Sequence, residues 1–591
     1  MKGKPDQNEF DCGLTEFLRL LYPQFDVDSL SSDVKAVFEG LSPTESEVEY
    51  WSEKDSVLIT YGNSITEPNE APLKTLKSFL DRDIGKAING VHVLPFFPYS
   101  SDDGFSIVDY LEVNPELGDW QNIAEISKRY RLMADLVLNH ISSESTWFKN
   151  FLDGKSPGEG FFIEADPSND YSQVVRPRTS PLLAEVETQR GPSHVWCTFS
   201  HDQVDLNFAD PRVLIEILKV IRHYLDAGIS ILRLDAIAYL WKKPDHSCIH
   251  AEETHAVVRL IRLLLDQFAP GTLLITETNV PNQENLSYFG NCNEAHVVYN
   301  FSLAPLLAHA LLTGTSRHLK TWMMSMPPAP PSCTYLNFTA SHDGIGMRPA
   351  EGLLSDEEQH ELVTTIESFG GKISRRSLSG GEEKAYELNI SLFDAMQGTS
   401  AGPDEYQAER FICSQTIMMS LEGIPAFYIH SLLATPNDYE GLQDTQRYRS
   451  INRKSWDLAE LEEHLKDATS PQGKIYRELI RRIQIRSAQP AFHPHATQFT
   501  LQLRECFFGF WRQSRDRQQS IFCVSNLTNE EQILEVTELN LIKNQVWRDL
   551  LRESVVESYQ RAWAVKPYRT LWITNSAKAR SEEHTSELQS P

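Results

Sequence analysis

Acidic and imidazole side chains follow four separate apolar runs of the sequence, each near the carboxyl end of its run. His140 closes LMADLVLNH, Asp235 lies near the end of ISILRLDA, Glu277 follows LLIT, and His342 with Asp343 follows YLNFTAS. One such residue after a strand is ordinarily a helix N-cap, but Asp, Glu and Asp at three strand ends indicate a reaction centre. Converging carboxylates suit glycosidic-bond chemistry, in which one attacks the anomeric carbon and another protonates the leaving oxygen.

The spacing around Asp235 supports this chemistry. Arg233 lies two residues before Asp235 on the same strand, so both side chains point to the same side and the guanidinium can hold the aspartate ionised. An acid that donates a proton near neutrality needs a raised pKa, which neighbouring carboxylates help to supply. The pattern therefore predicts one ionised and one protonated carboxyl group in the same site.

Eight apolar runs are placed to carry these residues, and helical patterns lie between several of them. The runs are dense in apolar residues rather than alternating, which is typical of strands buried on both faces of a parallel sheet. They begin at Val57, Gly90, Leu132, Ile229, Leu273, His296, Tyr335 and Ile424. Strands alternating with helices predict an α/β fold with a (β/α)8 TIM barrel, whose reactive residues gather at the carboxyl ends of the strands. A doubly wound open sheet is the alternative.

Changes in composition and residue pattern along the chain predict further structural units around this barrel. Residues 1–55 read as an N-terminal helical extension and 56–490 as the catalytic barrel, with an inserted subdomain over 141–228 after the third strand. The charged, Gly/Ser-rich patch SRRSLSGGEEK at 374–384 is expected to be a mobile loop. Residues 491–579 carry β-type runs and predict a C-terminal antiparallel β domain, and 580–591 is expected to be an artefactual or disordered tail outside the fold.

Composition excludes several classes of partner. A net charge of −27 argues against nucleic acid and against anionic membrane surfaces. No run approaches the ~20 apolar residues of a membrane helix, and no apolar segment follows the basic residues at the start, so a cytoplasmic location is expected. The eight cysteines are scattered without a CxxC pair, which predicts reduced thiols. No metal-ligand cluster is evident, so neither a metal nor another cofactor is expected.

Four motifs resemble the signature regions of the α-amylase superfamily, glycoside hydrolase family 13. They are DLVLNH at 135–140, ILRLDA at 231–236, ITETN at 275–279 and ASHDGIG at 340–346, in the family's order, with QVDLN at 203–207 and GIPAFY at 423–428 matching two further regions. The resemblance implies that Asp235 is the nucleophile, Glu277 the acid/base and Asp343 the transition-state stabiliser. It implies that His140, Arg233 and His342 hold the glucosyl unit. The complete catalytic set speaks against a non-catalytic member of the superfamily.

Within the superfamily the chain is similar to the sucrose phosphorylase branch. GVHVLPFFPYSSDDGFSIVDY, from Gly90, matches that branch's second-strand region, and HVWCTFSHDQVDLN, from His194, and INR at 451–453 match others. By this resemblance the residues that surround a single glucosyl unit at the closed end of the pocket also include Asp102, Phe105, Phe199, Gln203 and Arg453. Such a pocket accepts one end of a disaccharide and cannot thread a polymer.

The same resemblance places phosphate on two mobile loops. Arg178, in RPR, matches the arginine that meets phosphate, and Tyr386, in KAYELN, matches the tyrosine of the opposite loop. RPRTSPLLAEVE, ITETNVPNQENLSYFG and TASHDGIGMRPAEGLL look closer to glucosylglycerate phosphorylases and sucrose 6-phosphate phosphorylases than to plain sucrose phosphorylases. Both relatives handle an anionic acceptor, which Arg447 and Arg449 would suit.

The function that these observations predict is a retaining disaccharide phosphorylase, a hexosyltransferase of carbohydrate metabolism. It would move an α-glucosyl unit from sucrose, sucrose 6-phosphate or glucosylglycerate to inorganic phosphate through a covalent glucosyl-enzyme and release α-glucose 1-phosphate. The expected partners are thus a small disaccharide and phosphate. Two alternatives remain: an α-glucosidase-type hydrolase of the same fold, in which water resolves the intermediate, and a non-catalytic sugar-binding protein.

Overall fold

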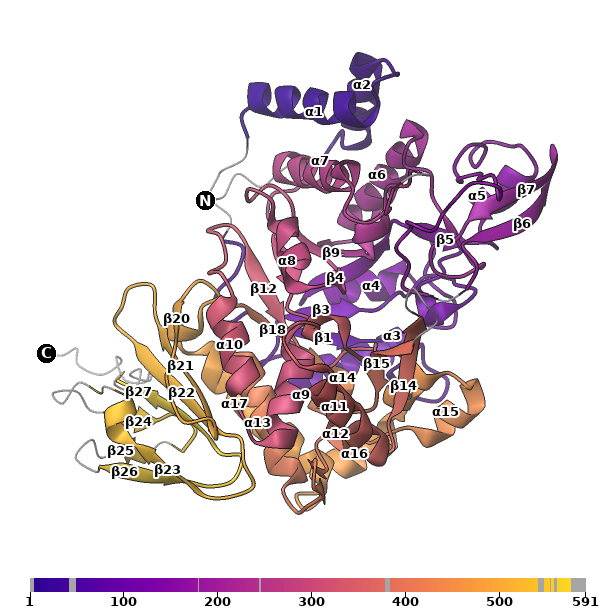
Figure 1. Ribbon diagram of the computed structural model, residues 1–591. Coiled ribbons are helices and arrows are strands. Elements are labelled where there is room, and N and C mark those ends of the chain that lie inside the picture. The colour runs from indigo at the N-terminus through magenta and orange to yellow at the C-terminus, as the bar shows by residue number, and fades with distance from the viewer. Residues whose placement is uncertain are drawn as a thin grey trace, which may run out of the picture.

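Eight parallel strands close into a barrel in the computed structural model, which confirms the predicted fold class (Figure 1). The structure describes residues 5–41, 49–178, 180–243, 246–377, 383–539, 541, 547–552, 554–556 and 561–575. In the order in which they pair around the barrel, the strands are β1 (Val57–Thr60), β18 (Ile424–Tyr428), β12 (Thr334–Asn337), β11 (Val297–Tyr299), β10 (Leu273–Thr276), β9 (Ile229–Asp235), β4 (Arg131–Val137) and β3 (Gly90–Val93). All eight predicted runs form these strands, and nearly every strand residue is buried because helices cover the outside.

A helix follows each barrel strand; seven of these helices return the chain to the next strand, and the last leads to the C-terminal sheet. These helices are α3 (Pro72–Phe79), α4 (Trp120–Ser127), α6 (Pro211–Asp226), α7 (Glu252–Phe268), α8 (Asn282–Leu286), α9 (Leu303–Thr313), α13 (Gln407–Ser420) and α17 (Pro471–Ser487). The ends of α6 follow from its sequence: the Asp210 side chain accepts from the Arg212 N–H, Pro211 opens the helix, and Gly228 adopts a φ of +86° just beyond it. The buried face of α6 then packs on the barrel and supports β9.

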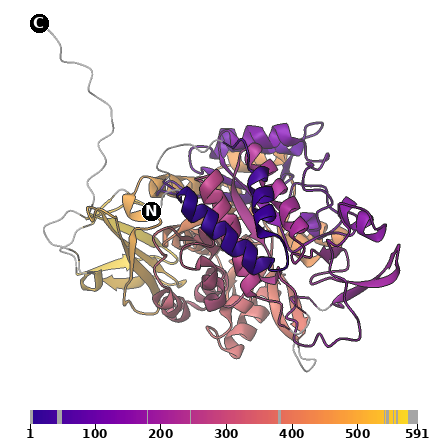
Figure 2. The same ribbon diagram turned by 90° about the horizontal axis from the view of Figure 1, so that it is seen from above.

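Two further helices, α1 (Gln7–Leu21) and α2 (Val27–Val37), lie across α7 and α6 (Figures 1 and 2). In α1 the residues Phe10, Leu14, Leu18 and Leu21 recur at helical spacing and are buried. The Phe268 ring at the end of α7 joins the two helices to the barrel, because it meets Phe10 edge-on at 5.4 Å and stacks on Phe38 at 5.3 Å.

The long chain between β4 and α6, called the inserted subdomain below, carries a helix and strands of its own; the range predicted for it, 141–228, also includes the barrel helix α6. The subdomain contains β5 (His140–Ser142), α5 (Thr146–Leu152), the hairpin β6 (Leu183–Thr188) with β7 (Gly191–Trp196), and β8 (Gln203–Asp205). Figures 1 and 2 show this subdomain on the side of the barrel away from the C-terminal sheet. Strand β8 pairs with β5, with His140 opposite Asp205, and this pairing ties the insertion to the end of β4.

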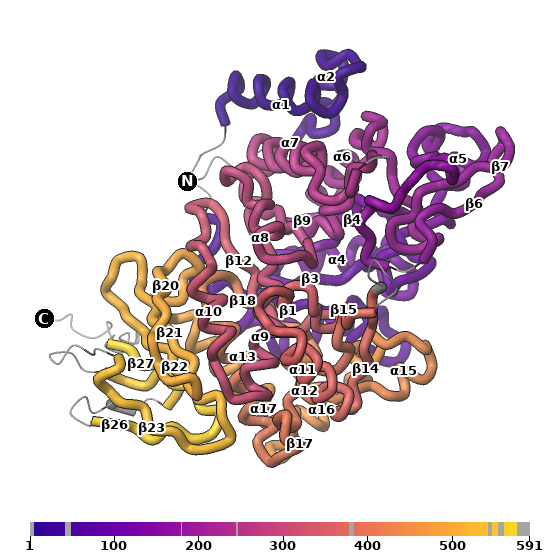
Figure 3. The backbone as a smooth tube through the Cα atoms, in the orientation of Figure 1, coloured from indigo at the N-terminus to yellow at the C-terminus, as the bar shows by residue number. Residues whose placement is uncertain are grey.

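The segment expected to be a mobile loop is largely a β hairpin, so that expectation is wrong for its described part. Strand β14 (Lys372–Ser377) pairs with β15 (Glu383–Asn389), and residues 378–382 between them lie outside the described residues. Strand β15 also pairs with β13 (Ile345–Gly346), just after Asp343, which fixes the hairpin beside the barrel mouth near α15 (Tyr439–Thr445) (Figure 3). A Cβ at Gly344 would lie 2.9 Å from the Leu388 carbonyl oxygen, so the close packing of β15 requires glycine there.

An antiparallel sheet follows the barrel, as predicted. Its strands, in pairing order, are β20 (Thr497–Thr500), β21 (Phe507–Gln513), β22 (Ser520–Asn526), β27 (Thr570–Thr574), β24 (Trp547–Asp549) and β25 (Ser554–Val556), and β23 (Gln532–Glu535) pairs separately with β26 (Ala562–Val565). Buried Arg486 of α17 donates to the carbonyls of Met419 and Phe492, which lie between the barrel helices and this sheet. Residues 580–591, the predicted tail, lie outside the described residues. Within the described part of the chain, no helix has the length and apolar content needed to cross a membrane.

Candidate active site

One pocket at the carboxyl ends of the barrel strands collects almost all the residues that the sequence singled out. The residues come from β9, β10, the loops after β3 and β12, the inserted subdomain and β15. Its lining includes Asp102, Phe105, His140, Arg178, Phe199, Gln203, Arg233, Asp235, Glu277, His342, Asp343 and Tyr386. Arg453 lies directly behind this lining, where its Nε donates to the His342 carbonyl oxygen at 2.7 Å. The predicted catalytic, glucosyl-binding and phosphate-binding residues are therefore neighbours in the structure.

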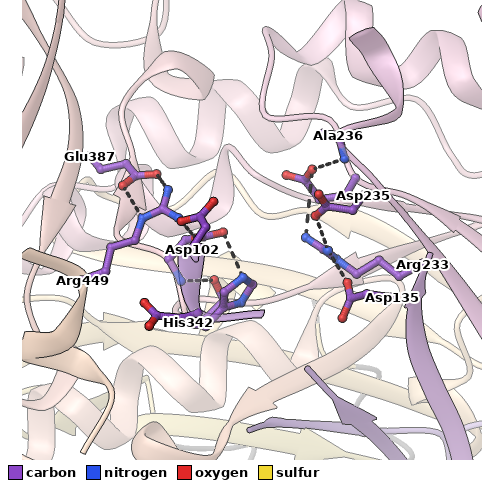
Figure 4. Close-up of polar contacts among 12 residues, drawn as sticks. Asp102, Asp135, Arg233, Asp235, Ala236, His342, Glu387 and Arg449 are labelled. Carbon is purple, nitrogen blue, oxygen red and sulfur yellow. Dashed lines mark hydrogen bonds and ion pairs between the residues drawn. The ribbon is translucent and has the colours of Figure 1, made fainter. Parts of the chain in front are cut away.

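The centre of the pocket is the Arg233 guanidinium, which three carboxylates share (Figure 4). Its Nη1 donates to Asp235 at 2.6 Å and to Asp135, and its Nη2 lies 4.0 Å from Glu277. Strand register explains the contact with Asp135, because Asp135 of β4 lies directly opposite Arg233 of β9. On its other side Asp135 lies 2.7 Å from the Nε2 of buried His92, and His92 and Arg233 hold the pKa of Asp135 at about 2 against the opposing effect of burial.

The backbone just after Asp235 is strained and joins the two central carboxyl groups. Ala236 has a φ of +49°, a left-handed conformation that costs a residue with a Cβ about 1–2 kcal/mol. Its N–H donates to Glu277 Oε2 at 3.0 Å. The turn thus places Asp235 at the end of β9 and holds the Glu277 carboxyl, from the end of β10, beside it.

Burial and mutual repulsion let Asp235 and Glu277 carry one proton between them. Burial and the neighbouring carboxylate of Glu277 raise the pKa of Asp235 to about 8, although Arg233 acts in the opposite direction. Burial also raises the pKa of Glu277, and the carboxylate of Asp343 adds to that increase. Because Arg233 contacts Asp235 directly and lies farther from Glu277, it favours the state of the pair in which Asp235 carries the negative charge and Glu277 the proton.

Asp343 is kept ionised by a second arginine. Arg449 Nη1 lies 2.7 Å from Asp343 Oδ1, and the same guanidinium binds both carboxylate oxygens of Glu387 on β15 (Figure 4). Burial opposes the charge, but Arg449, His342 and Arg453 together hold the pKa of Asp343 well below its ordinary value. The INR segment supports the geometry, because Asn452 Nδ2 donates to the carbonyl oxygens of Ser341 and Asp343.

The innermost end of the pocket offers hydrogen-bonding groups of fixed protonation. Asp102 and Asp103 both have a positive φ, of 54° and 49°, and this turn aims Asp102 at Gln203 Nε2, which donates to its Oδ2 at 3.2 Å. Arg449, Arg178 and Arg453 lower the pKa of Asp102 against the effect of burial, so it is ionised. The two charged partners of Asp103, Arg447 and Arg453, hold the strained turn in place.

Two neutral histidines and two aromatic rings complete this end. Burial lowers the pKa of His140, and it lowers that of His342 to about 3. The Phe105 ring stacks on His342 at 5.0 Å, and Phe199 packs against His140 at 5.1 Å. Hydrogen-bonding groups arranged around flat apolar faces are suited to one pyranose ring.

Arg178 and Tyr386 face the pocket from opposite sides, from the inserted subdomain and from β15. Arg178 is half-buried, and among the residues that the structure describes none forms a hydrogen bond or an ion pair with its guanidinium. Neighbouring Arg176 binds the carbonyl oxygens of Ser180 and Cys197 instead and so anchors the loop. The Arg178 charge is therefore available to an anion in the pocket.

The structure also reveals a buried cation that sequence reasoning missed. The Lys242 side chain is 1% exposed, and its ammonium lies 2.6 Å from buried Asp205 and donates to Asn139 Oδ1. Asp205 is two residues after Gln203 on β8, and Asn139 precedes His140. Lys242 thus connects the inserted subdomain to the barrel through residues that are close in sequence to Gln203 and His140, at the innermost end of the pocket.

The chain is similar in sequence and in structure to known carbohydrate-active enzymes. The family description "Alpha amylase, catalytic domain" matches residues 82–343. A glucosylglycerate phosphorylase of Spirochaeta thermophila is 44% identical over 478 residues, which are 81% of this chain and 81% of the relative. Another glucosylglycerate phosphorylase, from Escherichia coli, is 38% identical over 90% of this chain and 93% of its own length. Among solved structures, the sucrose 6F-phosphate phosphorylase of Thermoanaerobacter thermosaccharolyticum superimposes with a TM-score of 0.70 at 24% identity, covering 83% of this chain and 95% of that one.

Proposed function

This chain belongs to the α-amylase superfamily, glycoside hydrolase family 13, and within it to the glucosyl-transferring disaccharide phosphorylases, and we propose that its donor is glucosylglycerate. Three relatives named glucosylglycerate phosphorylase, at 38–44% identity, support glycerate as the acceptor group, whereas the sucrose 6(F)-phosphate and sucrose phosphorylases are 27–29% identical. The products of phosphorolysis are then α-glucose 1-phosphate and glycerate.

The first half-reaction uses the charges of the Asp235 and Glu277 pair. An Asp235 carboxylate oxygen attacks the anomeric carbon while the bond from that carbon to the glycerate oxygen breaks, and Glu277 gives its proton to the departing oxygen. The 2.6 Å contact of Arg233 with Asp235 and the raised pKa of Glu277 favour this division of roles. The step leaves a β-glucosyl ester on Asp235 and an ionised Glu277.

The positive charge that develops on the sugar ring meets fixed negative groups. Asp343 stays ionised through Arg449 and His342, and it contributes stabilisation of the oxocarbenium-like transition state. Asp102, His140 and Gln203 would hold the glucosyl hydroxyls at the closed end, where Arg453 fixes the position of His342 through its backbone. Preorganised charges of this kind need little rearrangement during the reaction.

In the second half-reaction phosphate takes the place of glycerate. A phosphate oxygen attacks the anomeric carbon from the face that glycerate left, the ester bond to Asp235 breaks, and the phosphate proton passes to Glu277. Two inversions at the same carbon give net retention, so the product is the α-anomer. Arg178 would bind the phosphate oxygens, with Tyr386 donating from the opposite side.

The observation that carries the proposal of phosphorolysis is the Arg178 guanidinium, which lines the same pocket as Asp235 and Glu277 and has no hydrogen-bond or ion-pair partner among the described residues. A phosphorolysis screen tests it, using glucosylglycerate, glucosylglycerol, sucrose and sucrose 6-phosphate at equal concentration with detection of glucose 1-phosphate. Glucosylglycerate is expected to give the highest kcat/KM. Release of free glucose at a rate independent of phosphate would instead identify a hydrolase.

A further inference from the structure

Most arginines around the pocket already have carboxylate partners. Arg449 binds Glu387 through two nitrogens and Asp343 through a third, and Arg447 and Arg453 both pair with Asp103. An anionic acceptor that used Arg447 or Arg449 would have to displace one of these carboxylates. A cation without a carboxylate partner would bind the charge of the acceptor without this cost.

Arg348 is a cation without such a partner. It opens the short helix η5 (Arg348–Ala350), five residues after Asp343, on the loop that follows β12. Its Nε is buried and has no hydrogen-bond partner, and within the described ranges no carboxylate forms an ion pair with its guanidinium. A buried guanidinium nitrogen with no acceptor is costly unless a ligand supplies one.

Arg348 is a neighbour of Tyr239, a residue that lines the pocket. Burial raises the pKa of the Tyr239 hydroxyl, Arg348 and Arg178 lower it, and the carboxylate of Glu277 raises it. The Tyr239 hydroxyl is thus close enough to hydrogen-bond with Arg348, and Tyr239 lines the same pocket as Arg178 and Glu277. Phe199 packs edge-on against the Tyr239 ring at 5.6 Å and fixes its orientation.

We propose that Arg348, together with the Tyr239 hydroxyl, binds the carboxylate of the acceptor, while Arg178 binds phosphate. The guanidinium of Arg348 and the hydroxyl of Tyr239 can both donate hydrogen bonds to an anion, and the planar guanidinium matches the planar shape of a carboxylate. The inference rests on the proposed function, because it requires an acceptor that carries a carboxylate close to the reacting hydroxyl. A neutral acceptor such as glycerol leaves Arg348 without a partner, and a site of this kind discriminates strongly against it.

The test compares a charged and a neutral acceptor in the reverse reaction. Transfer from α-glucose 1-phosphate to glycerate and to glycerol is measured for the wild type and for Arg348→Gln, and the phosphate KM is measured in the forward direction. We expect the glycerate KM to rise about 10- to 100-fold in the variant, which corresponds to about 1.4–2.8 kcal/mol. The KM values for glycerol and for phosphate are expected to stay within about threefold, since neither ligand uses this group.

Two results would overturn the assignment. One is an unchanged glycerate KM, and the other is an equal rise for glycerate, glycerol and phosphate, which indicates that Arg348 only supports the shape of the pocket. A wild type that makes product from glycerol but none from glycerate overturns the proposed function and this assignment with it. That outcome is seen without any variant, so the two failures are distinguishable.

Two further variants separate a loss of acceptor binding from a loss of folding. Arg317→Gln removes an arginine of the outer surface that is paired with Glu505, and its kinetic constants are expected to match those of the wild type. Arg348→Lys keeps the charge but not the fork, so a glycerate KM between those of the wild type and Arg348→Gln is expected. If Arg348→Gln does not fold, the ratio of the glycerate and glycerol KM values in Arg348→Lys decides the question, and an unchanged ratio overturns the assignment.

Discussion

Replacing Arg178 by alanine tests the phosphate site most sharply. The side chain is half-buried and has no hydrogen-bond or ion-pair partner among the described residues, so its removal leaves no protein carboxylate unpaired. Loss of one charge-assisted contact to phosphate costs roughly 1.5–3 kcal/mol. At about 1.4 kcal/mol per decade, the phosphate KM is expected to rise about 10- to 100-fold.

The assay measures glucose 1-phosphate and free glucose together at saturating disaccharide over a series of phosphate concentrations. Because Asp235 and Glu277 are untouched, the glucosyl-enzyme still forms, and water resolves a larger share of it in Arg178→Ala. Arg190→Ala is the control, since Arg190 belongs to the same inserted subdomain but pairs with Glu164 at the surface. An unchanged phosphate KM in Arg178→Ala would refute the phosphate role and leave Arg178 as a surface cation.

Three more changes follow from the same contacts. Asp235→Asn is expected to lower turnover by several orders of magnitude with the fold intact, and more than about a hundredth of the wild-type rate would show that another residue attacks. Glu277→Gln is expected to slow transfer from glucosylglycerate far more than from α-glucosyl fluoride, whose leaving group needs no proton; equal losses would exclude Glu277 as the acid. Burial raises the pKa values of Asp235, to about 8, and of Glu277 in the folded state, so the free energy of unfolding of the wild type falls as pH rises from the ordinary carboxyl range to about 8. Over that pH range the free energy of unfolding of Glu277→Gln, measured by urea unfolding, is therefore expected to increase relative to that of the wild type. A difference that stays constant with pH would contradict the shared proton. Lys242→Met leaves Asp205 buried and unpaired and is expected to lower the free energy of unfolding by about 3–5 kcal/mol, whereas Lys243→Met, at a half-exposed pair, should cost about 1 kcal/mol or less.

The sequence predicted the barrel well because local patterns determine its strands. Each run is dense in apolar residues and is bounded by polar or turn residues, and all eight runs form barrel strands. The residues at the ends of these strands, such as Asp235 and Glu277, followed from the fold, since the carboxyl ends of parallel strands meet at one mouth. The C-terminal sheet was equally readable from its β-type runs.

The contacts that tune the site were not readable, because they join residues far apart in the chain. Arg449 meets Glu387 across 62 positions, and Lys242 meets Asn139 across 103. The patch at 374–384 predicts a loop because its charged and Gly-rich sequence has no apolar alternation, whereas β14 and β15 are held by their pairing with each other and by the pairing of β15 with β13. The contact of Arg449 with Glu387 likewise depends on that hairpin, so the sequence alone does not bring these two residues together.

The central claim is that phosphate resolves a covalent glucosyl-enzyme formed on Asp235. The most direct measurement is the proton and phosphorus NMR of the product during the first turnovers of glucosylglycerate with inorganic phosphate. α-Glucose 1-phosphate is expected to appear first and in step with glycerate, at a rate that depends on the phosphate concentration. Initial formation of the β-anomer, or of free glucose at a rate indifferent to phosphate, would contradict the claim.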